Sequence, residues 1–584
     1  MHDIIYKTTL SRAIEQARIF FKDYNFEELP RKQFPKNNLT AAWRGSIKCA
    51  GADIYIIIGI PHLFPDELPK IFLTEDFKYF PIPHVDNKLF VCTYDSNRIT
   101  FYPEEVNKIL EETVEKAREI ISKGIVGTNE NDFSNEFLAY WNGEFTNYSI
   151  IEPIDGVLEI YVAQINSNIK GFKEVIGNDT KQIEQYVTNI NQHSEVIRYQ
   201  PCIYLPFKSP PIPPIPENCK EIIQLIERNN PEYKDILLKY LNHNNFTGTV
   251  LFSVKFNELY SLAGWKHRVA DKNAIVKGFR LGKLPLSVLE ERLSSQRITR
   301  FNIERLDTSR LQKRVGNYNN ILENKKVIIV GCGSIGSHIG FSIACSGIGE
   351  LILTDDDILV PENITRHVCG MGQINQAKVD SLSQKLRNHF PNLKVQVIKE
   401  KIQKVILDNN ETLINSDLII CATGNTVSER RLNKYQMYTP NCPPILYVWL
   451  EPWGIASQAL LIQKGVEESC LECCLTPKLD YIYSVVQLNN KEFIMQEAGC
   501  QTSYTPFSAV DAEQASSFAA RLAISFLNGD IVKSTRYTWL GDLDLIKKLE
   551  CEINPIFEGK PSFCLQIDYP KKKGNCPYCN ASAE

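Results

Sequence analysis

The sequence lacks a long apolar run, an excess of positive charge and an opening segment typical of secreted proteins. Its longest apolar stretches, such as residues 54–60, have the length of a strand, whereas a membrane-spanning helix needs about 20 apolar residues. Charged residues are scattered through the first 24 positions, which therefore do not resemble a signal peptide. The net charge of −4 favours neither a nucleic-acid nor an anionic-membrane partner. We therefore expect a cytoplasmic protein that binds neither.

Cysteine, in contrast, is abundant. The chain of 584 residues has 17 cysteines, an odd number, and no secretion signal. This combination favours a reducing compartment, in which cysteines serve metal binding or catalysis rather than disulfide bonds. The other proportions, 43% hydrophobic and 23% charged residues, are ordinary for a soluble protein. The length predicts about three or four domains.

The pattern of apolar residues divides the chain into three regions. Residues 1–145 combine strand-like runs with a closing amphipathic helix at 104–123, which predicts an α+β domain. Residues 146–300 mix short strands and helices around a proline-rich spacer at 206–216, and they hold no catalytic motif. Residues 301–584 alternate apolar strands with helices, which is typical of an α/β domain built on a parallel sheet.

The third region opens with a glycine-rich turn between a strand at residues 327–330 and a helix. Gly331, Gly333 and Gly336 let the main chain approach a phosphate, and the helix N-terminus adds partial positive charge. Asp355 ends the next strand, where a carboxylate can accept hydrogen bonds from ribose hydroxyls. The unit predicts a bound nucleotide. Two alternatives stay open: a tight turn without a ligand, and the similar loop of an NAD dehydrogenase.

Four polar residues follow Asp355 and separate these alternatives. They are Asp357, Asn363, Arg366 and Lys378. A dehydrogenase does not need such a cluster, whereas attack on the α-phosphate of ATP builds negative charge that arginine and lysine neutralise. Asn363 could donate to a phosphate or orient the leaving pyrophosphate. The sequence therefore favours an enzyme that adenylates its substrate, although Arg366 and Lys378 could also be surface charges.

Two Cys-x-x-Cys pairs lie roughly a hundred residues apart. Cys470 and Cys473 form the first pair, and Cys576 and Cys579 form the second. Two such pairs can place four thiolates tetrahedrally around Zn²⁺. The alternatives are two unrelated reduced pairs or a redox disulfide, and Cys474 could take the place of Cys473.

Two further cysteines are candidate nucleophiles. Cys500 lies in a loop rich in glycine and threonine ahead of Pro506, and Cys92 follows a proline-rich loop. A thiolate in an accessible loop could attack an acyl-adenylate and form a thioester. Each of the two could also be a buried, unreactive thiol.

The third region resembles the adenylating domain of ubiquitin-activating enzymes and of their bacterial sulfur-carrier relatives. Its glycine loop, Asp-x-Asp, Asn-x-x-Arg and downstream lysine match that family's spacing over about residues 310–580. The resemblance implies that Asp355 holds the ribose, and that Asn363, Arg366 and Lys378 act on the phosphates of ATP. It also implies a structural zinc and places the thioester cysteine where Cys500 lies.

For two residues of the family's site, the matching residue in this chain has to be proposed separately. Gly424 stands where the family has an aspartate that holds Mg²⁺, so either another carboxylate such as Asp357 serves the metal or adenylation is impaired. The family borrows an arginine from the partner subunit, which implies a homodimer. Arg314 is our candidate, with Arg310 and Arg305 as alternatives.

The first region resembles ubiquitin-conjugating enzymes. A Phe-Pro turn leads into a strand at residues 64–73, and His84 precedes Cys92, which a helix follows. Val85 and Asp86 replace the proline and asparagine of the family's His-Pro-Asn motif. The resemblance implies that Cys92 carries a thioester open to attack by an amine, and that His84 shapes the loop rather than acting as a base.

The order of the regions resembles the activating–conjugating fusion of bacterial antiphage (CBASS) operons. That resemblance implies adenylation of the C-terminal carboxylate of a CD-NTase (a cGAS-like nucleotidyltransferase), transfer to Cys500 and then Cys92, and amide formation with an acceptor protein or small-molecule amine. ATP, Mg²⁺ and Zn²⁺ would be required, and residues 146–300 would link or dock the domains. Two alternatives remain: a sulfur-carrier adenylyltransferase that yields a thiocarboxylate, and a non-catalytic nucleotide-binding scaffold, which Gly424 keeps open.

Overall fold

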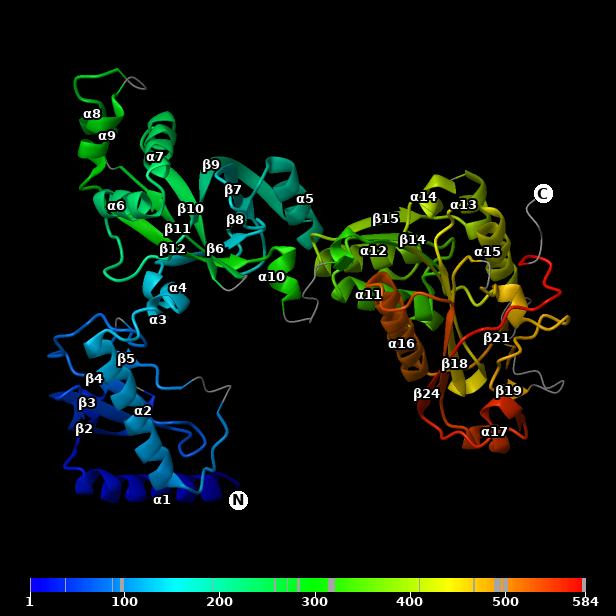
Figure 1. The fold of residues 1–584 in the computed structure, drawn as a ribbon, viewed down its shortest axis with the longest axis horizontal. Coiled ribbons are helices and arrows are strands. Elements are labelled where there is room, and N and C mark those ends of the chain that lie inside the picture. Colours follow the sequence, from blue (N-terminus) through cyan, green and yellow to red (C-terminus); the bar gives the residue numbers. More distant parts are fainter. Residues whose placement is uncertain are drawn as a thin grey trace. The chain divides into compact units, whose positions relative to one another are not determined.

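The computed structural model contains two compact units, each with a hydrophobic core of its own (Figure 1). The first comprises Met1–Ala163, Glu174–Asp179 and Tyr199–Arg305, and the second comprises Gln164–Lys173, Thr180–Arg198 and Leu306–Glu584. The structure describes the chain except residues 1, 37, 87, 95–98, 192, 257–258, 270, 281–283, 314–320, 409, 466–467, 488–494, 497–502 and 580–584. Cys500 and Arg314 therefore lie outside the described residues. Across the described chain, every helix is too short or too polar to cross a membrane.

The front of the first unit is a five-stranded antiparallel sheet in the order β1-β2-β3-β4-β5, accompanied by two helices. Its elements are α1 (His2–Asp23), β1 (Glu27–Glu28), β2 (Leu39–Cys49), β3 (Ala52–Pro61), β4 (Lys70–Leu73), β5 (Phe90–Val91) and α2 (Val106–Val126). The turn between β2 and β3 has two residues, Ala50 and Gly51, both with positive φ, as a hairpin turn that follows the strand twist requires. One apolar face of α2 shares a core with the sheet and α1. This α+β arrangement agrees with the prediction.

The rest of the first unit is a closed barrel with the strand order β10-β11-β12-β6-β8-β7-β9. Its strands are β6 (Phe145–Ser149), β7 (Leu158–Asn166), β8 (Glu174–Gly177), β9 (Glu195–Phe207), β10 (Gly248–Phe256), β11 (Leu259–His267) and β12 (Ile298–Arg305). The helices of the first unit in this part of the chain are α3 (Asp132–Asn135), α4 (Phe137–Trp141), α6 (Cys219–Asn229), α7 (Glu232–His243), α8 (Lys272–Val276) and α9 (Leu286–Leu293), whereas α5 (Thr180–Ile190) belongs to the second unit. The sequence predicted the mixture of strands and helices but not its closure into a barrel.

The second unit is built on an eight-stranded sheet in the order β15-β14-β13-β16-β17-β18-β22-β24. Strands β15 to β17 in this order are parallel and the remaining pairs are antiparallel, which confirms the predicted parallel sheet. The strands are β13 (Lys326–Val330), β14 (Glu350–Thr354), β15 (Lys394–Ile398), β16 (Leu418–Cys421), β17 (Ile445–Leu450), β18 (Ala456–Ile462), β22 (Thr535–Leu540) and β24 (Cys564–Asp568). Smaller pairs join β19 (Val486–Gln487) to β23 (Glu552–Ile553), and β20 (Met495–Gln496) to β21 (Ser503–Tyr504).

Helices cover both faces of this sheet (Figure 1). The helices after residue 306 are α10 (Thr308–Gln312), α11 (Ser334–Cys345), α12 (Lys378–His389), α13 (Ile402–Asp408), α14 (Asn410–Ile414), α15 (Thr426–Tyr438), α16 (Ala509–Leu527) and α17 (Asp544–Lys548). Strand β13 shows why its sequence is continuously apolar: Val327 and Ile329 enter one core, while Ile328 and Val330 enter the other.

Phe252 of β10 offers a test of the barrel core. Its fully buried ring packs against Trp141 at 5.0 Å and Trp265 at 5.7 Å between ring centroids. We expect Phe252→Ala to lower the free energy of unfolding of this unit by about 3–5 kcal/mol, because it leaves a cavity among rigid aromatic rings. Urea unfolding followed by tryptophan fluorescence measures this loss. Phe279→Ala, at a ring that is 40% exposed, is the control and should cost less than about 1 kcal/mol.

Candidate functional site

A cavity of about 540 Å³ lies at the carboxyl ends of strands β13 to β16. Strand β13 has β14 on one side and β16 on the other, so the chain connections leave β13 in opposite directions. Ligands of open α/β sheets bind at such a switch point, at the carboxyl ends of the strands. Five residues predicted from the sequence line the cavity: Gly331, Gly333, Asp355, Asp357 and Lys378. Residues far apart in sequence therefore meet in one place.

The three glycines of the turn have different roles. Gly331 has a φ of +88°, and a Cβ there would lie 2.8 Å from the carbonyl oxygen of Ala422. A Cβ on Gly336 would lie 1.8 Å from the carbonyl oxygen of Gly331, so only glycine lets α11 pack this closely against the turn. A Cβ on Gly333 would have no atom within 4 Å. The turn is thus close-packed at Gly331 and Gly336 and open at Gly333, which lines the cavity. This open position would let a phosphate group approach the main chain.

Two side chains hold the main chain of this turn. Asp355 accepts hydrogen bonds from the backbone N–H groups of Cys332 at 2.6 Å and Asp357 at 2.8 Å. His367 Nδ1 accepts from the Cys369 N–H, so its Nε2 carries the proton and donates to the Cys332 carbonyl at 2.8 Å. Burial lowers the pKa of His367 to about 4, which keeps it in this neutral form. His367 was not predicted, although it directly follows Arg366.

Charges of both signs meet in the cavity. Lys378, the first residue of α12, has a side chain that is only 12% exposed, and its Nζ lies 2.8 Å from Asp357 Oδ2. Carboxylate oxygens of Asp355, Asp356 and Asp357 lie within 4.8 Å of one another. Burial raises the pKa of Asp355. The lysine suits a phosphate, while the carboxylates are the ligand type that Mg²⁺ prefers.

Other lining residues were missed because they come from loops after later strands. Lys401 and Gln403 follow β15, and Asn425 and Ser428 begin α15. Gln403 donates to the Ser428 hydroxyl at 3.1 Å, which joins the two loops across the cavity. Their position after a strand of the parallel sheet was the available signal.

Four residues that the sequence analysis named in this region lie outside the lining set: Gly336, Asn363, Arg366 and Gly424. Asn363 accepts from the Val360 N–H at 3.2 Å and so closes a short turn. The Arg366 guanidinium stacks over the Phe507 ring, 4.5 Å from its centroid. Gly424 has a φ of +58° between two lining residues, a conformation that favours glycine over the family's aspartate.

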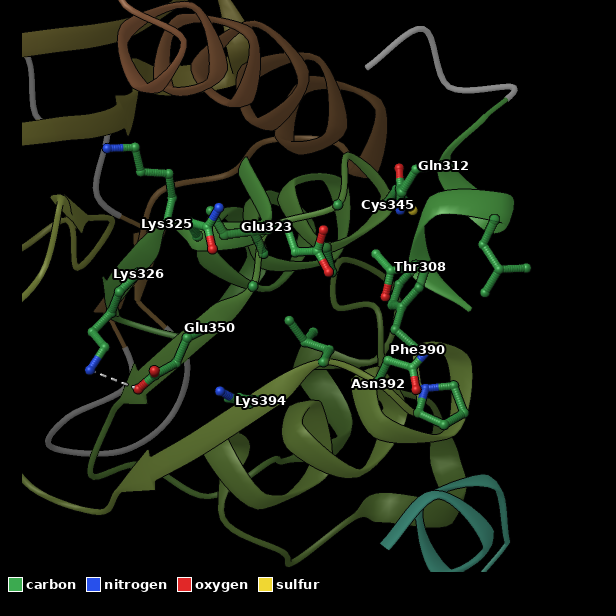
Figure 2. A pocket seen from close by; sticks show the side chains of 18 of the residues that line it. Thr308, Gln312, Glu323, Lys325, Lys326, Cys345, Glu350, Phe390, Asn392 and Lys394 are labelled. Carbon is green, nitrogen blue, oxygen red and sulfur yellow. Dashed lines mark ion pairs between the residues drawn. The ribbon is translucent and has the colours of Figure 1, made fainter. Parts of the chain in front are cut away.

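A larger cavity of about 880 Å³ lies at the opposite edge of the same sheet (Figure 2). Its charged residues are partly paired: Lys326 lies 3.0 Å from Glu350, and Lys325 lies 2.9 Å from Asp417. Among the residues that the structure describes, none of the sequence-predicted site residues lines it. Position and chemistry therefore favour the smaller cavity as the nucleotide site, despite its size.

The four cysteines of the two pairs come together. Cys470 and Cys576 have their sulfurs 3.6 Å apart, and Cys473 and Cys579 have theirs 3.5 Å apart. These are not disulfides, whose S–S distance is about 2.05 Å. Four sulfurs at about 2.3 Å from a zinc ion would lie about 3.8 Å apart, so the cluster fits that metal. Hydrogen bonds with Cys470 and Cys579 lower the pKa of Cys473, whereas the hydrogen bond with Cys473 raises the pKa of Cys470 and the one with Cys470 raises that of Cys579.

Helix α15 supports this cysteine cluster. Asn433 accepts from the Leu471 N–H at 2.9 Å, and Arg430 makes two bonds to Glu472 at 3.1 and 3.2 Å. Cys474 lies outside the cluster; it is buried, and burial raises its pKa. The structure therefore gives no support to an exchange of Cys473 for Cys474.

Cys92 is exposed, directly after β5 in the first unit. Its backbone N–H donates to the His84 carbonyl at 2.8 Å. Asp86, which stands where the family has asparagine, accepts from the N–H groups of Lys88 and Phe90, both at 2.9 Å, and so shapes the connecting hairpin. The loop thus presents a thiol on a well-bonded main chain.

Two family models match the chain. The ThiF family model matches residues 311–538, and the Prokaryotic E2 family B model matches residues 28–150. The first includes the nucleotide cavity and part of the cysteine cluster, and the second includes Cys92 and His84.

The chain is also similar to individual proteins. The ATP-dependent ubiquitin transferase-like protein Cap2 of Escherichia coli (strain TW11681) is 23% identical, over 98% of this chain and 97% of that protein. Cap2 of Pseudomonas aeruginosa (strain BWHPSA011 / Pa011) is 25% identical, over 48% of this chain and 47% of that protein. A crystal structure of E. coli MccB with ATP is 20% identical with a TM-score of 0.31, over 44% of this chain and 68% of that one. The chain therefore combines a region similar to the prokaryotic E2 family B with a region similar to the ThiF family.

Proposed function

We propose that this chain uses ATP to activate the C-terminal carboxylate of a protein and conjugates that protein to an amine. The observation that carries the proposal is the pairing, on one polypeptide, of a glycine-turn cavity containing Lys378 with an exposed Cys92. The near full-length similarity to an ATP-dependent ubiquitin transferase-like protein supports it. In this proposal residues 301–584 adenylate, residues 146–300 dock or link, and residues 1–145 conjugate.

The proposed chemistry has four steps. A carboxylate oxygen of the substrate attacks the α-phosphorus of ATP, and the bond to the bridging oxygen breaks to release pyrophosphate. The thiolate of Cys500 attacks the acyl carbon and AMP leaves. The thiolate of Cys92 then takes the acyl group and frees Cys500. Finally an amine attacks the Cys92 thioester, so that an amide forms and the thiol is released.

The cavity residues would take distinct roles in the first step. Lys378 would neutralise charge that develops on the phosphates, and Asp355 would accept from the ribose. Asp357 and its neighbours would hold Mg²⁺ in place of the missing aspartate at Gly424. Arg366 would leave Phe507 to reach the phosphates, and Arg314 would act across a homodimer.

Three finer assignments belong to the proposal. The substrate is a CD-NTase and the setting is antiphage defence, as the resemblance to CBASS fusions implies. The acceptor is an amine of a protein or small molecule. Zn²⁺ is held by Cys470, Cys473, Cys576 and Cys579, where it would fix the two chain segments to each other without entering the chemistry.

Lys378 tests the activation step. We expect Lys378→Met to lower substrate-dependent exchange of labelled pyrophosphate into ATP by about a hundredfold or more, because it removes the largely buried cation from the cavity. Lys533→Met, in the same unit but outside the cavity lining, should stay within about twofold of the unaltered protein. Exchange that is absent in the unaltered protein with its cognate substrate would leave only a nucleotide-binding scaffold.

The two cysteines test the order of transfer. With ATP, magnesium and substrate, we expect a thiol-sensitive adduct that disappears in Cys500→Ala. In Cys92→Ala the adduct should stall on Cys500 and no amide should form, because the second acceptor thiol is missing. Non-reducing gels and mass spectrometry of the adducts measure both. A sulfur-carrier activator would instead yield a thiocarboxylate and would not need Cys92.

The cysteine cluster tests the metal. We expect about one zinc per chain by elemental mass spectrometry, as a four-thiolate site requires. Cys576→Ser should release it and lower the melting temperature of the second unit, since the metal joins segments about a hundred residues apart. Cys551→Ser, outside the cluster, should keep the zinc. A purified chain with no zinc, and a Cys576→Ser variant of unchanged stability, would contradict the assignment.

A further inference from the structure

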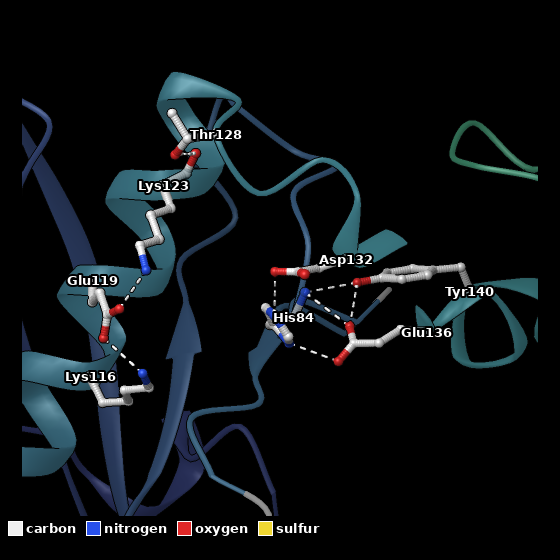
Figure 3. A network of polar contacts seen from close by, with 8 residues as sticks. All are labelled: His84, Lys116, Glu119, Lys123, Thr128, Asp132, Glu136 and Tyr140. Atoms are coloured by element: carbon white, nitrogen blue, oxygen red, sulfur yellow. Dashed lines mark hydrogen bonds and ion pairs between the residues drawn. The ribbon is translucent and has the colours of Figure 1, made fainter. Parts of the chain in front are cut away.

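The His84 side chain lies between two carboxylates from the segment that follows α2 (Figure 3). Its Nδ1 lies 2.7 Å from Glu136 Oε1, and its Nε2 lies 3.1 Å from Asp132 Oδ2. Glu136 and Asp132 belong to the short segment containing α3 and α4, not to the sheet that carries Cys92. The contact therefore joins two parts of the first unit.

The backbone of His84 is held by the same segment. Its N–H donates to Tyr140 Oη at 2.9 Å and to Glu136 Oε2 at 3.2 Å, and the Tyr140 hydroxyl donates to Glu136 Oε2 at 3.2 Å. His84 has a φ of +63°, a conformation that costs free energy for a non-glycine residue and persists where surrounding contacts hold it. The His84 carbonyl then accepts from the Cys92 N–H.

The segment itself is anchored in the barrel. Trp141, the last residue of α4, is fully buried, and its Nε1 lies 3.2 Å from each of the carbonyl oxygens of Gly264 and Phe301. Phe137 joins the same core. Glu136 and Tyr140 therefore lie on a segment that is fixed to the barrel core, and their side chains contact the loop that precedes Cys92.

Both ring nitrogens of His84 face carboxylate oxygens, so both act as donors and neither lone pair can take a proton from an attacking amine. The hydrogen bond with Glu136 raises the pKa of His84, against the effect of burial. Burial opposes ionisation of Glu136, yet its bonds with His84 hold its pKa below the ordinary value. On the neighbouring helix α2, Glu119 pairs with Lys116 at 2.7 Å and with Lys123 at 2.6 Å.

We infer that Glu136, with Asp132, is a positioning residue of the conjugation site: it holds the charged His84 ring and, through the His84 carbonyl, fixes the backbone that presents Cys92. The inference rests on the proposed use of Cys92 as a thioester carrier. It gives the barrel a role in conjugation, because the carboxylates that set the loop stand on barrel-anchored helices.

The charge on His84 predicts how this support depends on pH. A group with a raised folded pKa stabilises the fold fully below its unfolded value of about 6.5, and this stabilisation is lost as pH rises through the folded pKa. Glu136, with its lowered pKa, contributes above about 4.5 and is lost as pH falls through its folded pKa. The support should therefore be strongest between these two limits.

The test compares Glu136→Gln with Glu130→Gln, which changes an exposed carboxylate shortly before Asp132, outside the His84 contacts. Exchange of the imidazole C2 hydrogen, followed by mass spectrometry of the His84 peptide, gives the titration midpoint of His84 in the full chain. We expect a midpoint above about 6.5 in the unaltered protein, a lower midpoint in Glu136→Gln, and no change in Glu130→Gln.

Discharge of the Cys92 thioester to an amine gives the second readout. We expect Glu136→Gln to slow it about five- to tenfold below the His84 midpoint, as expected for losing a charge-assisted bond, and the difference to vanish above that midpoint. Taking the ratio of the two proteins at each pH cancels the ionisation of the amine. Pyrophosphate exchange should stay within about twofold, because the nucleotide cavity belongs to the second unit, which the substitution does not alter. Tyr140→Phe should slow discharge without lowering the midpoint, since the hydroxyl bonds the His84 backbone N–H and the Glu136 carboxylate but makes no bond to the ring.

Two results would overturn the inference: a His84 midpoint that Glu136→Gln does not move, or a loss of discharge that is the same at every pH and in Glu130→Gln. If the unaltered protein forms no thioester, the proposed function fails instead. The His84 midpoint and the rate at which iodoacetamide alkylates Cys92, each compared between the unaltered protein and Glu136→Gln, would still decide whether Glu136 positions the Cys92 loop.

Discussion

The nucleotide cavity of the second unit depends on the close packing of α11 against the turn after β13. Only glycine fits at position 336, because a Cβ there would lie 1.8 Å from the carbonyl oxygen of Gly331. This contact directs the helix N-terminus toward the carboxyl ends of the parallel strands, where Asp355 and Lys378 also lie. Asp355 and His367 then fix the remaining polar groups of the turn. The shape of the cavity is thus fixed by the backbone of the turn, and its charged side chains come from the loops that follow neighbouring strands.

The first unit is subject to a different constraint, because a cysteine that carries a thioester must be accessible to its partners and also held in a defined position. Cys92 is exposed, so packing does not fix it. Its main chain is fixed through His84, which a tyrosine and two carboxylates hold from outside the sheet. Buried or half-buried charge pairs are costly to break, because removing one partner leaves the other uncompensated. The loop is therefore ordered by these polar contacts together with the buried side chains of Val85 and Val91.

The parts of the site that the sequence predicted share one physical property: their residues lie in local patterns. The glycine turn, Asp355 at a strand end and the two Cys-x-x-Cys pairs each require only a few neighbouring positions. The sequence also predicted that the two cysteine pairs meet, because a tetrahedral zinc site needs four thiolates and two such pairs can supply them at any separation along the chain. His367, Lys401 and Gln403 escaped prediction because their roles depend on which loops the sheet order brings to one edge.

The sequence by itself determined that an α+β region comes first and a parallel-sheet α/β region comes last, because apolar periodicity and glycine positions reflect backbone geometry. It also singled out Asp355 and Lys378, which line one cavity, and the four cysteines that cluster in the structure. Only the tertiary structure decided that the middle strands close into a barrel, that Arg366 stacks over Phe507, and that Asp132 and Glu136 enclose His84. The physical reason is that strand closure and ion pairing depend on contacts between segments far apart in the chain, which no local pattern specifies.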